Sequence, residues 1–155
     1  MKRLIASSLL TILCAGSCLA NENATPAEAE ERLKAIVGLV KAKGAAAGKD
    51  VMAADDPVKC KYKDMVCMLM DTADGTFLAQ TALAKLVGTK FDPEMADVDG
   101  VPIVEQWIGP AKQGKTQWQA KWKFARPDTK KVSPRLATCA KADATRVACV
   151  SVAQP

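Results

Sequence analysis

Residues 65–80 read MVCMLMDTADGTFLAQ and contain a long apolar run, a turn signal and a shorter apolar run. The continuous apolar run at 65–70 is typical of a strand that is buried on both faces. The TADG sequence at 72–75 predicts a turn, so residues 76–79 are expected to return as an antiparallel partner strand. This hairpin is the first part of the predicted sheet.

The chain after the hairpin predicts helical segments and then three more strands. Residues 81–100 form a loop-rich segment with a short apolar helix, TALAKLVG, and a longer helix is expected from about Pro102 to Gly114. Three antiparallel strands follow at 116–124, 135–140 and 146–152, and a turn at 126–129 joins the first two.

The chain before the hairpin predicts a long helix. TPAE at 25–28 supplies an N-cap threonine, a proline at the first helical position and a glutamate at the third. Apolar residues at helical spacing and a stop at Gly44 complete it, and a second helix is expected at 45–54. We therefore predict an α+β domain in which a long N-terminal helix packs on a five-stranded antiparallel sheet.

The first twenty residues have the layout of a secretory signal peptide, with a basic start, a short apolar run and small residues at the end. We expect cleavage after Ala20, which leaves 21–155 as one domain that is periplasmic or secreted. A rival prediction is a lipoprotein box at 15–18 that ends in an acylated Cys18. Later apolar runs are each interrupted by charge, so no transmembrane segment is expected after residue 20.

Six cysteines become four after this cleavage: Cys60, Cys67, Cys139 and Cys149. An even number in an oxidising compartment predicts two disulfides. Of the three possible connectivities we favour Cys60–Cys67 and Cys139–Cys149, because each pair is local and the second spans a predicted hairpin.

The composition argues against several classes of function. Removal of Lys2 and Arg3 lowers the formal net charge from +5 to +3, and the lysines are scattered, so no nucleic-acid partner is expected. The chain has no histidine and no recognisable nucleophile or acid–base pair, so we predict neither an enzyme nor a catalytic residue. The DVDG sequence at 97–100 lacks the further oxygen ligands of a calcium loop, and no metal or cofactor is expected.

Five segments, taken in order, resemble a single Cache domain, the extracytoplasmic sensor module of many chemoreceptors. They are the 65–80 hairpin, KLVGTKF at 85–91, DVDGVPIVEQW at 97–107, QWQAKWKFARPDTKK at 117–131 and SPRLATCAKADATRVACVSV at 133–152. The resemblance implies a PAS-like architecture, a small-molecule ligand and a membrane-bound signalling or transport partner. The chain departs from the family pattern at four positions: Met70 replaces an aromatic residue, Gln80 a histidine, Arg135 a lysine and Thr138 a tyrosine.

The expected ligand pocket lies on the sheet face of Trp118, Trp122 and Arg135, opposite the long helix and under the 81–100 segment. The tryptophans are four residues apart, so they share one face of a strand, and the Arg135 guanidinium suits a carboxylate from a small organic acid. The remaining candidates are Gln80, Thr138 and Met70. Two functions stay open: an exported domain that binds a small molecule for sensing or presentation, and a structural or interaction subunit of an envelope assembly that has lost the pocket.

Overall fold

The computed structural model describes residues 23–125 and 131–154. The predicted signal peptide, its cleavage site and the rival lipoprotein box lie outside these residues, as does the predicted turn at 126–129.

The chain begins with the predicted long helix, α1 (Pro26–Lys43). Thr25 and Glu28 form a capping box, in which each side chain binds the backbone N–H of the other residue and satisfies donors that a helix start leaves open. Gly44 ends α1 with a positive φ of 58° and begins a short 3₁₀ turn, η1 (Gly44–Ala46). The second helix, α2 (Ala47–Met52), lies within the expected range.

Five strands form one antiparallel sheet in the order β2-β1-β5-β4-β3. Their bounds are β1 (Val66–Asp71), β2 (Phe77–Gln80), β3 (Gln117–Ala125), β4 (Val132–Lys141) and β5 (Arg146–Ala153). Because β5 pairs with both β1 and β4, it joins the β1–β2 hairpin to β4 and β3. The predicted fold class is confirmed.

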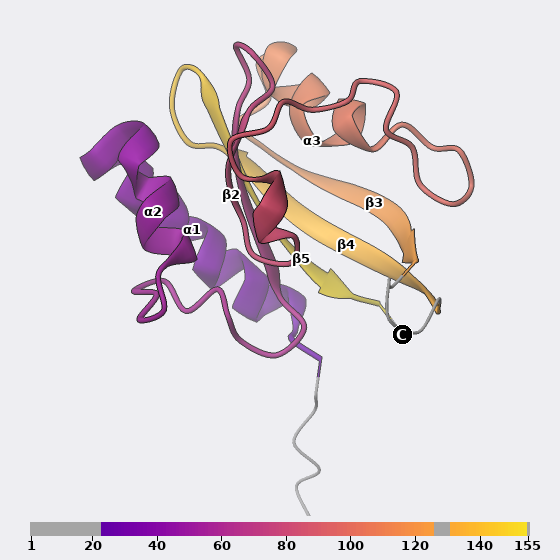
Figure 1. The fold of residues 1–155 in the computed structure, drawn as a ribbon, viewed down its shortest axis with the longest axis horizontal. Helices are drawn as coiled ribbons and strands as arrows, with labels where there is room; N and C mark the ends of the chain where they lie inside the picture. The colour runs from indigo at the N-terminus through magenta and orange to yellow at the C-terminus, as the bar shows by residue number, and fades with distance from the viewer. Residues whose placement is uncertain (1–22, 126–130, 155) are drawn as a thin grey trace, which may run out of the picture.

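Helices cover both faces of the sheet (Figure 1). On one face, α1 and α2 pack over Cys67, Leu69 and Val150. On the other face, α3 (Ile103–Lys112) packs over Met68 and Met70. Consecutive residues of β1 therefore point into different cores, which explains why its apolar run is continuous.

The predicted helix at 81–88 is wrong, because only a 3₁₀ turn, η2 (Ala84–Leu86), forms there. The backbone N–H of Gly88 binds the carbonyl of Phe77, and the N–H of Phe77 binds the carbonyl of Thr89. These bonds return the chain to the outer edge of β2, so a helix cannot continue through Gly88, whose φ is +83°.

The structure contains both predicted disulfides. Cys60–Cys67 ties the loop before β1 to that strand, and Cys139–Cys149 crosses from β4 to β5. Cys67 lies in the core under α1, whereas Cys139 and Cys149 lie in the core under α3. Each side of the sheet therefore holds one covalent link.

Candidate functional site

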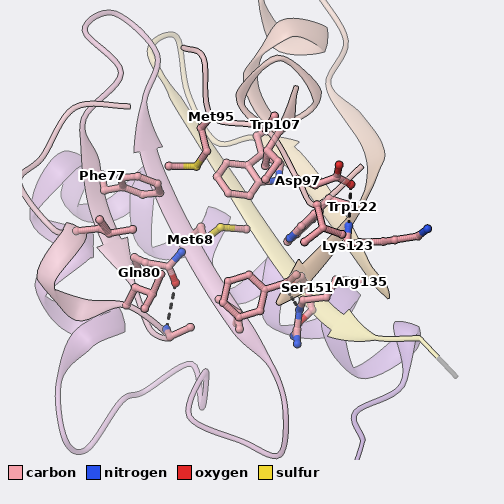
Figure 2. Close-up of a pocket in the computed structure, with 18 residues that line it drawn as sticks. Met68, Phe77, Gln80, Met95, Asp97, Trp107, Trp122, Lys123, Arg135 and Ser151 are labelled. Atoms are coloured by element: carbon pink, nitrogen blue, oxygen red, sulfur yellow. Dashed lines mark hydrogen bonds between the residues drawn. The ribbon is translucent and has the colours of Figure 1, made fainter. Parts of the chain in front are cut away.

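A cavity of about 410 Å³ lies on the sheet face opposite α1, below the segment that joins β2 to α3. Figure 2 shows its side chains, which come from all five strands, from α3 and from this covering segment. The lining residues are Val66, Met68, Phe77, Gln80, Ala82, Leu83, Leu86, Met95, Ala96, Asp97, Val98, Ile103, Trp107, Trp122, Lys123, Phe124, Arg135 and Ser151. Most are apolar, as is typical of small-ligand sites.

The strand register explains which sheet residues form the floor. Residues that pair across antiparallel strands point to the same face. One row of paired positions contains Val66 and Ser151, and a neighbouring row contains Arg135 and Trp122. The cavity forms above these residues, and Ile103 and Trp107 of α3 form part of its wall.

Aromatic rings build one wall of the cavity. The centroids of Trp107, on α3, and Trp122, on β3, lie 5.2 Å apart with the rings at 76°. Phe77 lies 6.3 Å from Trp107, and Phe91 completes the cluster behind them. Edge-to-face contacts of this kind are favourable and hold the rings in fixed positions.

The segment at 81–102 covers the cavity and is attached to β3 through Asp97. This carboxylate accepts hydrogen bonds from the backbone N–H groups of Lys123, Asp99 and Val101. The bonds from Lys123 and Val101 hold the pKa of Asp97 below its ordinary value. The ammonium of Lys123 lies 2.6 Å from the Asp99 carboxylate, and this hydrogen bond raises the pKa of Lys123.

Arg135 lies at the floor of the cavity, and its guanidinium binds protein groups. Its Nε donates to the hydroxyl of Ser151 at 3.1 Å, and one terminal nitrogen donates to the carbonyls of Asp64 and Ser151 at 2.6 and 3.1 Å. The Asp64 carboxylate lies 3.7 Å from the same nitrogen. The arginine side chain is only 11% exposed, so these bonds are shielded from water.

Two buried groups on the wall have hydrogen-bonding capacity left. The Gln80 side chain accepts a hydrogen bond from Ala82 N–H through Oε1, while its amide nitrogen points toward the cavity (Figure 2). Within the described part of the chain, no hydrogen bond is formed by that nitrogen or by the buried indole Nε1 of Trp107. Both residues are about 5% exposed.

Three of the six residues predicted for the ligand site line the cavity: Gln80, Trp122 and Arg135. The other three do not. Trp118 lies under α3 and donates to the carbonyl of Gln106, and Met70 is fully buried in the same core. Thr138 pairs with Gln119 and Val150, so it points to the opposite face, where it borders a separate hollow beside α1. We therefore remove these three from the candidate site.

Sequence reasoning missed several wall residues, although some could have been found. Val66 and Met68 alternate with Met70 along β1, so strand periodicity alone places these three on one face. Ser151 joins them because it pairs with Val66. Asp97 lies in the 81–102 segment, which carries no periodic signal. Trp107 lies on α3, and the path of the same segment determines where α3 packs. Their positions depend on tertiary contacts.

No helix among residues 23–125 and 131–154 is long and apolar enough to cross a membrane. In the same residues, no three acidic or cysteine side chains group together as metal ligands would.

The sequence matches no known family model and no curated protein, whereas its fold matches solved sensor domains. A methyl-accepting chemotaxis protein from Vibrio parahaemolyticus superimposes with a TM-score of 0.60 at 15% identity, over 82% of this chain and 84% of that chain. A periplasmic sensor domain of a chemotaxis protein gives 0.58 at 13% identity, over 83% and 94%. A Cache chemosensory domain described for carboxylic acid recognition gives 0.57 at 15%, over 82% and 86%. The chain therefore has the Cache fold that its sequence segments predicted.

Proposed function

We propose that this chain is an extracytoplasmic domain that binds one small molecule in the cavity between the sheet and the 81–102 segment. The observation that carries this proposal is the cavity itself. Its volume of about 410 Å³ falls within the range of roughly 300–1,000 Å³ that small-ligand pockets occupy. Its apolar wall with a few buried polar groups is the usual composition of such sites.

The fold and the cysteines support this reading. The structural neighbours are sensor domains of chemotaxis proteins, which favours binding over catalysis. Two disulfides and a signal-peptide-like start favour a compartment outside the cytoplasm. In this proposal the ligand-bound domain acts on a membrane-bound signalling or transport partner.

The alternative is an interaction subunit that keeps the fold without a ligand. It is favoured by the burial of Trp118 and Met70 in the core and by the internal bonds of Arg135. The two functions differ in one respect: only the first requires that a small molecule occupy the cavity.

A thermal-shift screen of the purified protein separates them. The library contains small acids, amines, amino acids, ketones, esters and amides. A ligand at about 100 times its dissociation constant stabilises a protein by ~2.7 kcal/mol, which is readily measured. We expect at least one hit in the unmodified protein.

Paired variants test whether a hit binds in this cavity. Val66→Phe places a larger side chain in the cavity and is expected to abolish the shift, whereas Val87→Phe adds the same bulk at an exposed position that does not line it. A hit that survives Val66→Phe would place the site elsewhere. A library without any hit would favour the interaction subunit.

A further inference from the structure

We infer that the cavity selects an uncharged, largely apolar ligand that carries a hydrogen-bond acceptor such as a carbonyl oxygen. This inference rests on the proposed function and names the chemical class that the same cavity takes. It replaces the organic acid expected from Arg135 in the sequence.

The first argument is that every charged group on the cavity wall already has a protein partner. Asp97 accepts three backbone hydrogen bonds, and Lys123 pairs with Asp99. Arg135 is bound by Ser151 and by Asp64. An ionised ligand would leave water and meet no uncompensated opposite charge, which is unfavourable in a mostly apolar site.

The second argument concerns what a carboxylate would have to displace. Asp64 also accepts hydrogen bonds from the backbone N–H groups of Ala24 and Ala153 through its two oxygens. A ligand carboxylate that took Arg135 would separate it from a carboxylate held in place by both ends of the domain. This competition between two anions for one cation works against acidic ligands.

The third argument is that the cavity wall offers a hydrogen-bond donor. The amide nitrogen of Gln80 points toward the cavity from β2 and donates to no described residue. The indole N–H of Trp107 is buried out of contact with the cavity space, so it takes no part in this argument. A donor that a ligand shields from water without a partner is costly, so a ligand that supplies an acceptor gains by satisfying Gln80. A neutral donor satisfies a neutral carbonyl oxygen without the cost of burying a charge.

Three probes of similar size and shape test the ligand class by calorimetric titration: acetophenone, benzoate and isopropylbenzene. Acetophenone has a neutral acceptor, benzoate has a charged one, and isopropylbenzene has none. We expect acetophenone to bind at least tenfold more tightly than benzoate. Benzoate affinity equal to or above that of acetophenone would overturn the inference and leave the proposed function intact.

One substitution tests the donor. Gln80→Met should weaken acetophenone binding roughly two- to tenfold more than it weakens isopropylbenzene binding, the value of one hydrogen bond. Gln119→Met is the control, because that residue is exposed and lies off the cavity wall. Equal effects of Gln80→Met on the two ligands, or no effect on acetophenone, would contradict the role of the donor. Thermal unfolding of each variant checks that it remains folded.

If none of the three probes binds, the wider library decides. A hit that is charged at neutral pH overturns the ligand class and supports the proposed function, and a neutral hit that has an acceptor supports both. An apolar hit without an acceptor overturns only the inference. A library without any hit overturns both.

Discussion

Arg135 lies at the predicted place in the candidate site, but its role differs from the predicted binding of a ligand carboxylate. It lies on the expected sheet face beside Trp122, yet its guanidinium is used to bind Asp64 and Ser151. Asp64 in turn holds the backbone at Ala24 and at Ala153. The arginine thus belongs to a network that joins the start of α1, the loop before β1 and the end of β5.

We predict that Arg135→Ala lowers the free energy of unfolding by about 2–3 kcal/mol. The substitution leaves the largely shielded Asp64 carboxylate without its cation, and such losses approach the lower end of the range for broken buried ion pairs. Urea denaturation provides the measurement. Lys34→Ala is the control, because Lys34 forms a surface pair with Glu30 and should change stability by less than ~1 kcal/mol. Equal effects of the two substitutions would argue against a structural role for Arg135.

Half of the residues predicted for the ligand site line the cavity, and the reasons differ by residue. Strand periodicity correctly put Trp118 and Trp122 on one face, but Trp118 lies under α3. Arg135 shares that face because it pairs with Trp122. Periodicity identifies a face and does not show which part of it a helix covers. The partners of Arg135 were unpredictable, because Asp64 is 71 residues away along the chain.

At the level of elements, the contact between α2 and β2 depends on the absence of a side chain. A Cβ atom at Gly48 would lie 2.2 Å from the backbone oxygen of Leu78. The backbone of β2 cannot yield as the end of a flexible side chain would. Gly48 therefore permits α2 to lie directly against the edge hairpin.

We expect Gly48→Ala to destabilise the protein by about 2–3 kcal/mol, because α2 must move away from β2. Gly38→Ala is the matched control on the exposed side of α1, where no atom lies within 4 Å of the added Cβ. There the change should stabilise the helix by up to ~1 kcal/mol, since alanine has the higher helix propensity. Chemical denaturation of both variants gives the comparison. A neutral Gly48→Ala variant would show that this contact has room to relax.

Local signals predicted most of the elements. Thr25 and Glu28 marked the start of α1, and the apolar run at 65–70 predicted a strand with two buried faces. The short helix expected at 81–88 failed, because hydrogen bonds from Phe77 to Gly88 and Thr89 draw that segment along β2. Such bonds are long-range competitors that a local pattern does not contain.

For the whole molecule, the disulfides lie on opposite sides of the sheet and stabilise different parts of it. Cys60–Cys67 restrains the loop that contains Asp64, and Cys139–Cys149 joins the neighbouring inner strands β4 and β5. Because both links close short loops, they restrict the unfolded chain by similar amounts.

We predict that the double substitution Cys139→Ala/Cys149→Ala lowers the free energy of unfolding by about 2–3 kcal/mol, the chain-entropy value for a loop of this length. Cys60→Ala/Cys67→Ala should have a similar effect. Urea denaturation measures both, and mass spectrometry of the unreduced protein should show the loss of two hydrogens for each disulfide. Free thiols in the exported protein would contradict the pairing.

The hydrogen bonds that attach the 81–102 segment and α3 to the sheet also affect how the protein behaves in concentrated solution. An open sheet edge offers unpaired backbone groups to which a strand of another molecule can add. On β3, side chains of Gln106 and Asp97 occupy the N–H groups of Lys121 and Lys123. On β2, Gly88 and Thr89 occupy the outer backbone groups of Phe77. The 81–102 segment and α3 thus shield part of both edges of the sheet. The elements that shape the pocket therefore also protect the domain against self-association and fibre growth.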